Sequence, residues 1–286
     1  MKQFKYTARN KKWIIDNKKK YLMINNLSSQ RKYRVEREKE AHENKDILGE
    51  NQRLKENYFS HTKDNKYFKS FNDRPYSLIS SKNNSFILEL GSGYGDRSIK
   101  LAQDGASVTG IDISETYISL AIAKAKKLGL PQDRLLFKKM DCHCLDFQDN
   151  FFDFVCGDAI LHHLDVGVVL EETNRVLKPG GVAVFIEPLD GNPLLKLFRY
   201  LTPEARTIDE KPLSRNDLKI IYKSWIVLSE YYGILCAPIS ALTSLLRITN
   251  PDNIMVKFAA ILERKVNVLS FFHSYNQYVL LHLIKK

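Results

Sequence analysis

Short apolar runs alternate with helix-like segments through the middle of the chain. The runs SFILEL (85–90) and ASVTGID (106–112) each fit a short buried strand, and residues 96–103 between them are long enough for a helix. Ser114 can cap a further helix, whose apolar positions recur at helical spacing and which ends near Gly129. This part of the chain is therefore predicted to fold as strand, helix, strand, helix.

The same alternation continues to about residue 190. RLLFKKMD (134–141) and FFDFVCGD (151–158) contain a third and a fourth strand, and residues 166–177 carry one apolar helical face. A turn over residues 178–181 then precedes VAVFIEP (182–188), a fifth strand. Strands that alternate with helices predict a doubly wound α/β domain with a parallel sheet covered on both faces.

The last third of the chain is more apolar. Trp225 to Leu246 is a stretch of 22 residues whose only charge is Glu230, which is long enough to cross a bilayer. However, WIVLSEYY (225–232) fits a strand that continues the sheet, and PISALTSLL (238–246) fits a separate helix. QYVLLHLI (277–284) predicts one more strand. A membrane span and attachment to a membrane surface both stay open as alternatives.

The net charge of +11 is confined to the beginning of the chain. Residues 1–84 hold 21 Lys and Arg against 10 Asp and Glu, whereas residues 85–286 hold 23 of each. Charges of alternating sign between residues 34 and 58 predict one or two exposed helices. This basic arm suits nucleic acid, lipid headgroups, an acidic substrate or simple solvation.

Two domains follow from these patterns. Residues 1–84 are expected to form the basic arm and a helical lid, and residues 85–286 the α/β domain, with an apolar helical insertion near 233–265. An aromatic cluster fits a substrate pocket but is better explained as the contact that fixes the extension to the domain. The cluster comprises Tyr58, Phe59, Tyr67, Phe68, Phe71 and Tyr76.

The cysteine content argues against a disulfide-rich secreted fold. The chain has only four cysteines. Cys142 and Cys144 flank His143, but this spacing is not the usual spacing of metal ligands. We therefore expect buried thiols and no metal site. The basic first residues, MKQFKYTARNKKW, lack the apolar segment of a signal peptide. The cytoplasm is the expected location, with peripheral contact with a membrane as an open addition.

A glycine-rich turn follows the first strand. Its sequence, Glu89-Leu90-Gly91-Ser92-Gly93-Tyr94-Gly95, lets the backbone turn sharply and approach a ligand closely. It differs from the dinucleotide fingerprint G-x-G-x-x-G, because position 96 is Asp. A carboxylate before the glycines would repel a pyrophosphate, so the turn favours a cationic ligand.

Acidic residues stand near the carboxyl ends of the first three strands. Glu89 belongs to the first strand, Asp112 ends the second and Asp141 closes the third. Open α/β sheets bind ligands in the crevice at this edge, where a carboxylate can accept both hydroxyls of a ribose. A carboxylate at Asp141 can accept a hydrogen bond from the amine of a purine. Together with the glycines, these residues predict a nucleoside site.

Successive motifs in residues 84–190 resemble one known superfamily. ILELGSGYG, GIDIS, the Asp141-Cys142 pair, FDFVCGDAILHHL and RVLKPGGVAVF are similar to the motifs of class I S-adenosylmethionine-dependent methyltransferases, in the branch that includes small-molecule enzymes. The resemblance implies a Rossmann-like sheet of seven strands with helices on both faces. It implies S-adenosylmethionine as the cofactor and S-adenosylhomocysteine as the product.

The resemblance also assigns residues to the parts of the cofactor. The glycine-rich turn, with Gly95 as its last glycine, would hold the methionine part, and the ends of the second to fourth strands the rest. The assignments are Gly91, Ser92 and Gly93 to the methionine part, Glu89 to its ammonium, Asp112 to the ribose, Ile113 to the adenine face, Asp141 and Cys142 to the adenine edge, and Gly157 and Asp158 to the sulfonium end.

The candidate catalytic residues follow the fourth and fifth strands. His162 and His163 are predicted at the crevice, where a histidine can remove a proton from the acceptor. Glu187 ends the fifth strand and is expected to face the acceptor, and Arg206 is a candidate partner for an anionic group of the substrate. Residues 187–213 resemble a loop found in a subset of the superfamily whose substrates are unassigned.

These observations lead to one expected function and two alternatives. The expected function is methyl transfer to an oxygen or carbon atom of a small-molecule acceptor, with a lipophilic acceptor left open. No Asn/Asp-Pro-Pro-aromatic motif follows the fourth strand, which argues against a nucleobase amine as the acceptor. An RNA methyltransferase that binds phosphates with the basic arm is one alternative. A protein that binds S-adenosylmethionine without catalysis is the other. The oligomeric state stays open.

Overall fold

The computed structural model describes residues 60–79, 84–194 and 211–286, together with six single positions. These positions are residues 33, 36, 37, 40, 196 and 200. Most of the helices expected between residues 34 and 58, two aromatic residues of the cluster (Tyr58 and Phe59) and Arg206 lie outside the described residues.

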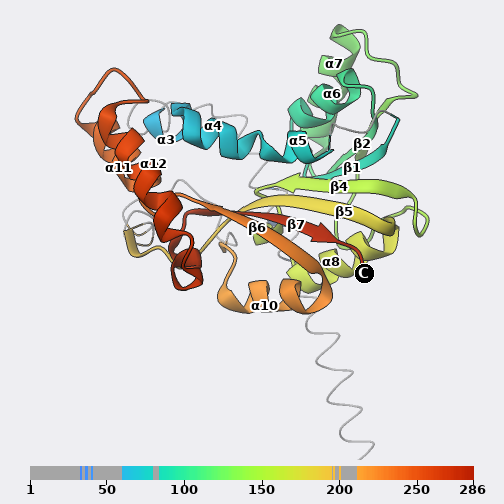
Figure 1. Cartoon of the computed structure of the whole chain (residues 1–286). Coiled ribbons are helices and arrows are strands. Elements are labelled where there is room, and N and C mark those ends of the chain that lie inside the picture. The colour runs from blue at the N-terminus through green and yellow to red at the C-terminus, as the bar shows by residue number, and fades with distance from the viewer. Residues whose placement is uncertain are drawn as a thin grey trace, which may run out of the picture.

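A seven-stranded sheet forms the centre of the described structure, in the order β3-β2-β1-β4-β5-β7-β6 (Figure 1). This confirms the predicted Rossmann-like architecture. The strands are β1 (Phe86–Leu90), β2 (Ser107–Asp112), β3 (Leu135–Lys139), β4 (Phe152–Asp158), β5 (Leu177–Pro188), β6 (Ile226–Tyr232) and β7 (Tyr278–Ile284).

The expectation of a wholly parallel sheet is wrong at β7, which runs antiparallel to both β5 and β6. The reason lies in the connection before it. β6 ends at Tyr232, and Tyr232 pairs with Tyr278 at the start of β7. The intervening insertion stays at this end of the sheet, so the chain re-enters the sheet where it left and must run back.

Helices cover both faces of the sheet, as the doubly wound pattern predicts. In Figure 1, α6 (Asp96–Gln103) and α7 (Glu115–Lys127) lie on one side, and α8 (Val166–Val176) and α10 (Arg215–Ser224) lie on the other. Because side chains alternate along a strand, each strand contributes to two hydrophobic cores. Ile87 and Glu89 of β1 face α6, whereas Leu88 and Leu90 belong to the core beneath α8.

Local signals in the sequence set the ends of α7. The Ser114 hydroxyl accepts a hydrogen bond from the backbone N–H of Tyr117 (3.3 Å), which is the predicted N-cap. Gly129, just past the last turn, adopts a positive φ of 70°. Both ends of this helix were therefore predictable from the sequence.

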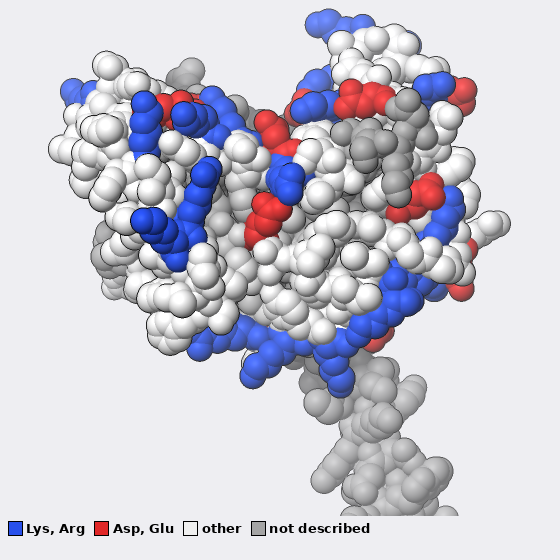
Figure 2. All heavy atoms as spheres, viewed as in Figure 1, with Lys and Arg blue, Asp and Glu red and all other residues white. Residues whose placement is uncertain are grey.

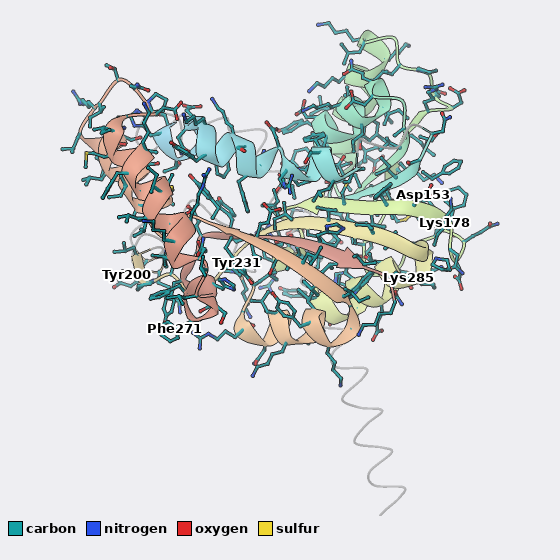
Figure 3. The ribbon with its side chains drawn as sticks, in the orientation of Figure 1. Asp153, Lys178, Tyr200, Tyr231, Phe271 and Lys285 are labelled. Atoms are coloured by element: carbon teal, nitrogen blue, oxygen red, sulfur yellow. The ribbon has the colours of Figure 1, made fainter. Side chains whose placement is uncertain are left out.

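The turn expected over residues 178–181 lies inside β5 instead. Phe152 pairs with Leu177 and Phe154 with Val182. Residues 178–181 therefore lie opposite the single residue Asp153, and the strand forms a bulge there and does not end. The Lys178 ammonium binds the Asp153 carboxylate at 2.8 Å. Figure 3 shows both residues with Lys285 at the end of the sheet that lies away from Tyr231.

Three short helices carry the end of the N-terminal extension across the sheet. They are α3 (Ser60–Asp64), α4 (Lys66–Asn72) and α5 (Arg74–Ile79). Phe71 of α4 is buried and stacks on Tyr232 of β6 at 5.4 Å between ring centroids, and Phe68 meets the same ring edge-on at 5.6 Å. The aromatic residues thus fix the extension to the domain, as their clustering predicts.

The apolar stretch from Trp225 divides into β6 and a helix, α11 (Cys236–Leu245), and the insertion continues with α12 (Ile254–Val266) and the 3-10 helix η3 (Ser270–Tyr275). Gly233 allows the chain to turn between β6 and α11 with a φ of 101°. Among the described helices, none has the length and apolar character needed to cross a membrane.

A buried carboxylate holds the start of α11. Glu263 of α12 is 5% exposed, and its oxygens accept hydrogen bonds from the backbone N–H groups of Gly233 (2.8 Å), Leu235 (2.8 Å) and Cys236 (2.7 Å). These donors belong to the turn and first residues of a helix, where no intrahelical acceptor exists. Glu263 therefore joins the two helices of the insertion.

Replacement of Glu263 by Ala should destabilise the protein by about 2–4 kcal/mol, because three buried N–H groups lose their acceptor. Urea unfolding followed by circular dichroism measures this free energy. Glu171→Ala, which removes an exposed carboxylate from α8, is the matched control and should change it by less than about 0.5 kcal/mol. Equal effects of the two substitutions would contradict the role assigned to Glu263.

Candidate functional site

A cavity of about 260 Å³ lies at the carboxyl ends of β1 to β4. Its position is the crevice where open α/β sheets bind ligands, and its volume lies just below the usual range for small-molecule sites. The lining residues come from the turns after these strands and from α7. They are Gly91, Gly93, Tyr94, Asp112, Ile113, Tyr117, Met140, Asp141, Cys142, Asp158, Ala159, Ile160, His163 and Leu164.

The Asp112 carboxylate is held at the cavity by backbone groups. Its Oδ2 accepts a hydrogen bond from the Gly93 N–H (2.9 Å), and its Oδ1 accepts one from the Ser114 N–H (2.9 Å). These bonds join the end of β2 to the glycine turn on one side and to the start of α7 on the other. Each oxygen keeps a further lone pair, so the carboxylate can still accept two hydroxyl groups.

Two glycines of the turn have different spatial constraints. Gly91 has a φ of 65°, and a Cβ there would lie 2.6 Å from Cδ1 of Ile160, so a side chain is excluded by packing. Gly93 has a φ of 49°, and a Cβ there would meet no atom within 4 Å. Since Gly93 lines the cavity, its bare backbone leaves room for a ligand rather than for protein.

Asp141 is fixed by the histidine that follows it. Its Oδ1 accepts from the His143 N–H (2.9 Å) and lies 2.7 Å from the ring Nδ1. The other ring nitrogen, Nε2, accepts from the Asp165 N–H at the start of α8 (3.0 Å), so the proton of a neutral ring is on Nδ1. Both nitrogens are engaged within the protein, which leaves neither for a metal.

The two cysteines beside His143 differ in environment. Cys142 is buried on the cavity wall, and this burial raises the pKa of its thiol to about 12. Cys144 is exposed, so the expectation of buried thiols is wrong there, because residues 142–144 form a turn and not a strand end. No group of three His, Cys, Asp or Glu side chains in the described parts of the chain could hold a metal ion.

Asp158 places a third carboxylate on the cavity wall and pairs with a buried arginine. Its Oδ2 lies 2.8 Å from Nη2 of Arg97, which is 7% exposed. Desolvation raises the pKa of Asp158, although the positive charge of Arg97 opposes this effect. Arg97 also lies over the ring of Tyr76 in α5, at 5.3 Å from its centroid. The arginine thus connects the site with the N-terminal helices.

Glu89 does not line the cavity, contrary to the expectation that it contacts the ligand. It lies one residue inside β1 with its side chain toward α6, where the Ser98 hydroxyl donates a hydrogen bond to its Oε2 (2.5 Å). Burial raises the pKa of Glu89 to about 7, while Arg97 and the bond from Ser98 act in the opposite direction. Its role in the structure is to support the helix after the glycine turn.

The expectation that Glu187 faces an acceptor is wrong. Its side chain is fully buried and accepts from the backbone N–H groups of Ile160 (2.9 Å), Leu161 (2.7 Å) and His162 (3.3 Å). It also lies 2.8 Å from Nδ1 of the His162 ring. Because these contacts occupy the carboxylate, Glu187 positions the turn after β4 and does not touch the cavity.

The two neighbouring histidines therefore differ. His162 is 5% exposed and does not line the cavity, whereas His163 is half-buried and does. Their rings lie 4.1 Å apart between centroids. His163 therefore lies where the base predicted from the sequence is needed, at the cavity. The His162 ring lies between the His163 ring and the Glu187 carboxylate.

Over half of the predicted site residues meet at one cavity. Gly157, Gly95 and Ser92 are not on its wall, although Gly157 packs under Ile160 and Ser92 precedes Gly93. The cavity residues that the sequence interpretation missed are mostly apolar or aromatic, and nothing but position marks them in the sequence. The predicted residues on the wall are Gly91, Gly93, Asp112, Ile113, Asp141, Cys142, Asp158 and His163, and the missed ones are Tyr94, Tyr117, Met140, Ala159, Ile160 and Leu164.

A second cavity, of about 500 Å³, lies at the same edge of the sheet near the end of β6. Its walls come from α4, α5, β6, α11 and the α12 region, so the N-terminal helices and the insertion enclose it together. Tyr231, labelled in Figure 3, and Tyr232 form the β6 wall. Arg74 and Glu230 also line it and form an ion pair (2.9 Å).

Comparison with known proteins gives matches over the α/β region. Residues 88–185 match the family model described as "Methyltransferase domain". The chain is 34% identical over 127 residues to demethylmenaquinone methyltransferase of Bacillus pumilus, covering 43% of this chain and 53% of that one. It is 34% identical over 111 residues to 27-O-demethylrifamycin SV methyltransferase of Amycolatopsis mediterranei, covering 38% and 40%. The chain thus spans about half the length of these relatives.

The fold is also similar to that of solved structures. Geranyl diphosphate C-methyltransferase from Streptomyces coelicolor, in a complex with Mg²⁺, geranyl diphosphate and S-adenosyl-L-homocysteine, superimposes with a TM-score of 0.56. The superposition covers 77% of this chain and 80% of that chain at 13% sequence identity. At this identity the likeness concerns the fold.

Substitution of Glu89 by Gln should change how stability depends on pH. Folding raises the pKa of Glu89 from 4.5 to about 7, so between these values the folded protein retains a proton that the unfolded chain has lost. The wild-type free energy of unfolding therefore falls as pH rises through this window, by up to about 3 kcal/mol from this group, and Glu89→Gln lacks this contribution.

Urea unfolding of both proteins between pH 4.5 and 8 measures the effect. The free energy of unfolding of Glu89→Gln should rise relative to that of the wild type as the pH rises to about 7, and the difference should then stay constant. Glu171→Gln on the surface of α8 is the control, for which no such shift is expected. A difference between Glu89→Gln and wild type that is the same at every pH would show that Glu89 keeps an ordinary pKa.

Proposed function

We propose that the chain is a class I S-adenosylmethionine-dependent methyltransferase, which transfers a methyl group from this cofactor to an oxygen or carbon atom of a small-molecule acceptor. The observation that carries the proposal is the meeting of three carboxylates around one cavity. Asp112, Asp141 and Asp158 come from the ends of three different strands and line the same hollow.

The residues present fit this cofactor, which is a nucleoside with a positive sulfur and an ammonium group. The acidic walls suit a cation, and the open space over Gly93 would admit a ligand that a Cβ would exclude. The aromatic rings of Tyr94 and Tyr117 lie 4.8 Å apart on the same wall and offer apolar surface. Both the charge of the cavity wall and the space over Gly93 therefore suit this cofactor.

The cofactor residues follow from the positions of these groups. Asp112 would accept the ribose hydroxyls, Ile113 would pack on the adenine, and Asp141 with Cys142 would face its edge. Asp158 lies on the remaining part of the wall and would face the sulfonium end. The ammonium, which the sequence assigns to Glu89, would also be closer to Asp158, because Asp158 reaches the cavity and Glu89 does not. When bound, S-adenosylmethionine supplies a methyl group activated by the positive charge on sulfur.

The protein's own residues would align the acceptor and remove its proton. In-line displacement depends mainly on the orientation of the acceptor relative to the methyl group. The turn Asp158-Ala159-Ile160 would help to fix this orientation. Ala159 has a φ of 53°, and its N–H donates a hydrogen bond to the Ile186 carbonyl (2.8 Å). His163 would accept the proton of a hydroxyl or an acidic carbon. His162 and Glu187 would keep His163 in place.

The second cavity is the proposed site for the apolar body of the acceptor, whose reacting atom would extend to the first cavity, where His163 and the cofactor residues lie. It opens at the same edge of the sheet as the first, and Phe71, Tyr231 and Tyr232 give it aromatic walls beside the Arg74–Glu230 ion pair. An acceptor with an aromatic or other apolar body and a polar group suits these walls. The two relatives named above are methyltransferases of demethylmenaquinone and of 27-O-demethylrifamycin SV, which are small molecules.

A cytoplasmic location is part of the proposal. All four cysteines are free thiols, and three of them are buried, which suits a reducing compartment. No described residue favours RNA as the acceptor over a small molecule. Binding without catalysis is the remaining alternative and is separated from methyl transfer by the first experiment below.

The wild-type protein, incubated with S-adenosylmethionine labelled in its methyl group and a cell extract, should place label in a small-molecule or lipid-soluble fraction. Asp112→Asn keeps the size of the side chain but loses the charge and one acceptor oxygen. It should weaken cofactor binding, measured by calorimetry, by at least about tenfold, in keeping with the loss of a charged hydrogen-bond acceptor.

Asp104→Asn, an exposed carboxylate at the end of α6, is the matched control and should leave both binding and transfer unchanged. Label in RNA would replace the proposed acceptor by a nucleic acid. Tight cofactor binding with no label in any fraction would refute transferase activity altogether.

His163→Gln should lower kcat by about 10²-fold or more and leave the Kd for S-adenosylmethionine within a factor of three, because a general base acts on the acceptor. His282→Gln in β7 changes a half-buried histidine that lines neither cavity and should leave kcat unchanged. Calorimetry and initial rates with the identified acceptor measure the two quantities. Unchanged kcat in His163→Gln would exclude this histidine as the base.

A further inference from the structure

The helix α12 has an inverted distribution of side-chain sizes. Its inward positions hold Val256, Ala259, Ala260 and Glu263, all of which are buried. Three of these side chains are small, and the fourth is the carboxylate that holds the start of α11. The helix therefore packs against the protein with little of its apolar surface.

The large apolar side chains of α12 point away from the protein instead. Ile254 is 77% exposed, Phe258 61% and Ile261 55%, and Met255 and Leu262 lie on the same side with 38% and 37%. At 100° per residue, these five positions fall within one face of the helix, opposite the buried positions. We call these five residues the α12 face.

Residues before and after α12 in the chain are also apolar and exposed. Leu245 and Leu246, at the end of α11, are 54% and 60% exposed, and α11 packs against α12. After α12, Leu269 is 58% exposed and Phe271 70%. Figure 3 places Phe271 at the outer edge of the same lobe. Several exposed apolar side chains on one lobe mark an interaction site in a folded protein.

The exposed charges of α12 are all basic, and the nearest acid before the helix, the half-buried Asp252, accepts a hydrogen bond from the Lys66 N–H (2.8 Å). Lys257, Arg264 and Lys265 are exposed on α12, and Arg247 is exposed before it, whereas the only acid of α12 is the buried Glu263. In Figure 2, the lobe that Figure 1 labels α11 and α12 is largely uncharged and carries Lys and Arg side chains. A partner that suits this lobe has an apolar interior and a negatively charged surface.

We propose that the α12 face docks on the surface of an anionic lipid bilayer. Helices that lie in the interface combine a stripe of Phe, Leu and Ile with Lys and Arg beside it. On α12, Lys257 and Arg264 lie along one border of the apolar face, and Lys265 lies at the C-terminal end of that face. The long basic side chains can reach the headgroups while their stems cover apolar surface. A second copy of this chain would bring cations against cations, so charge favours the bilayer over a dimer.

The docking surface adjoins the larger cavity. Arg264 and Val268 line that cavity, and Val268 is 79% exposed next to the α12 face. Docking would therefore place the cavity beside the membrane, where an apolar acceptor is concentrated. The docking inference does not depend on methyl transfer, because its test measures lipid binding alone.

Sedimentation with vesicles tests the proposal on the full chain. Wild-type protein should bind vesicles of equal parts phosphatidylglycerol and phosphatidylcholine, and bind vesicles of phosphatidylcholine alone at least tenfold more weakly. Phe258→Ser/Ile261→Ser should lower binding to the anionic vesicles by at least tenfold. Leu120→Ser/Ile122→Ser on α7 removes two apolar residues of similar exposure (46% and 44%) and should leave binding unchanged.

A second pair of variants tests the charges. Lys257→Glu/Lys265→Glu should weaken binding to the anionic vesicles by at least fivefold, and Lys126→Glu/Lys127→Glu on α7 should have a smaller effect. All of these positions are exposed, so circular dichroism should report unchanged folding. Because the basic residues 1–59 are identical in every variant, their own attraction to lipid cannot produce these differences.

Two results would overturn the proposal. One is equal vesicle binding by wild type and Phe258→Ser/Ile261→Ser. The other is a wild-type dimer in analytical ultracentrifugation that Phe258→Ser/Ile261→Ser converts to a monomer, which would assign the face to a second copy of the chain.

Discussion

The hydrogen bonds from Gly93 and Ser114 to the carboxylate of Asp112 determine the geometry of the site. They connect three elements that meet at the carboxyl edge of the sheet: the turn after β1, the end of β2 and the start of α7. The Ser92 N–H also donates to the Ile111 carbonyl (2.9 Å), but Asp112 provides the bond from the turn to the cavity wall. The ligand groups that Asp112 can still accept are hydroxyls, which is why the cavity suits a ribose.

Buried glutamates solve the same structural problem twice. Glu187 accepts three backbone N–H groups after β4, and Glu263 accepts three at the start of α11. In each place a chain segment leaves the sheet edge through a tight turn whose donors have no backbone acceptor. One glutamate steadies the turn that bears His163, and the other steadies the insertion that encloses the larger cavity. Both sites thus depend on a buried carboxylate that accepts backbone hydrogen bonds.

The sequence predicts the elements more fully than the orientations of side chains. Hydrophobic period and caps locate the strands and α7, since these signals are local, and strand ends locate Asp112 and Asp141. Glu89 and Glu187 could not be placed in the same way, because their partners lie 9 and up to 27 residues away. The antiparallel direction of β7 depends on where the insertion packs, which no local pattern encodes. Ile160 enters the site through its contact with Gly91, a purely tertiary effect.

A crystal structure with S-adenosylhomocysteine tests the central claim most directly. The account predicts both ribose hydroxyls within hydrogen-bond distance of the Asp112 oxygens, with the adenine between Ile113 and the side chain of Asp141. The Gly93 N–H should keep its bond to Asp112. A nucleoside bound instead in the cavity beside Tyr231, or a ribose that faces away from Asp112, would contradict it.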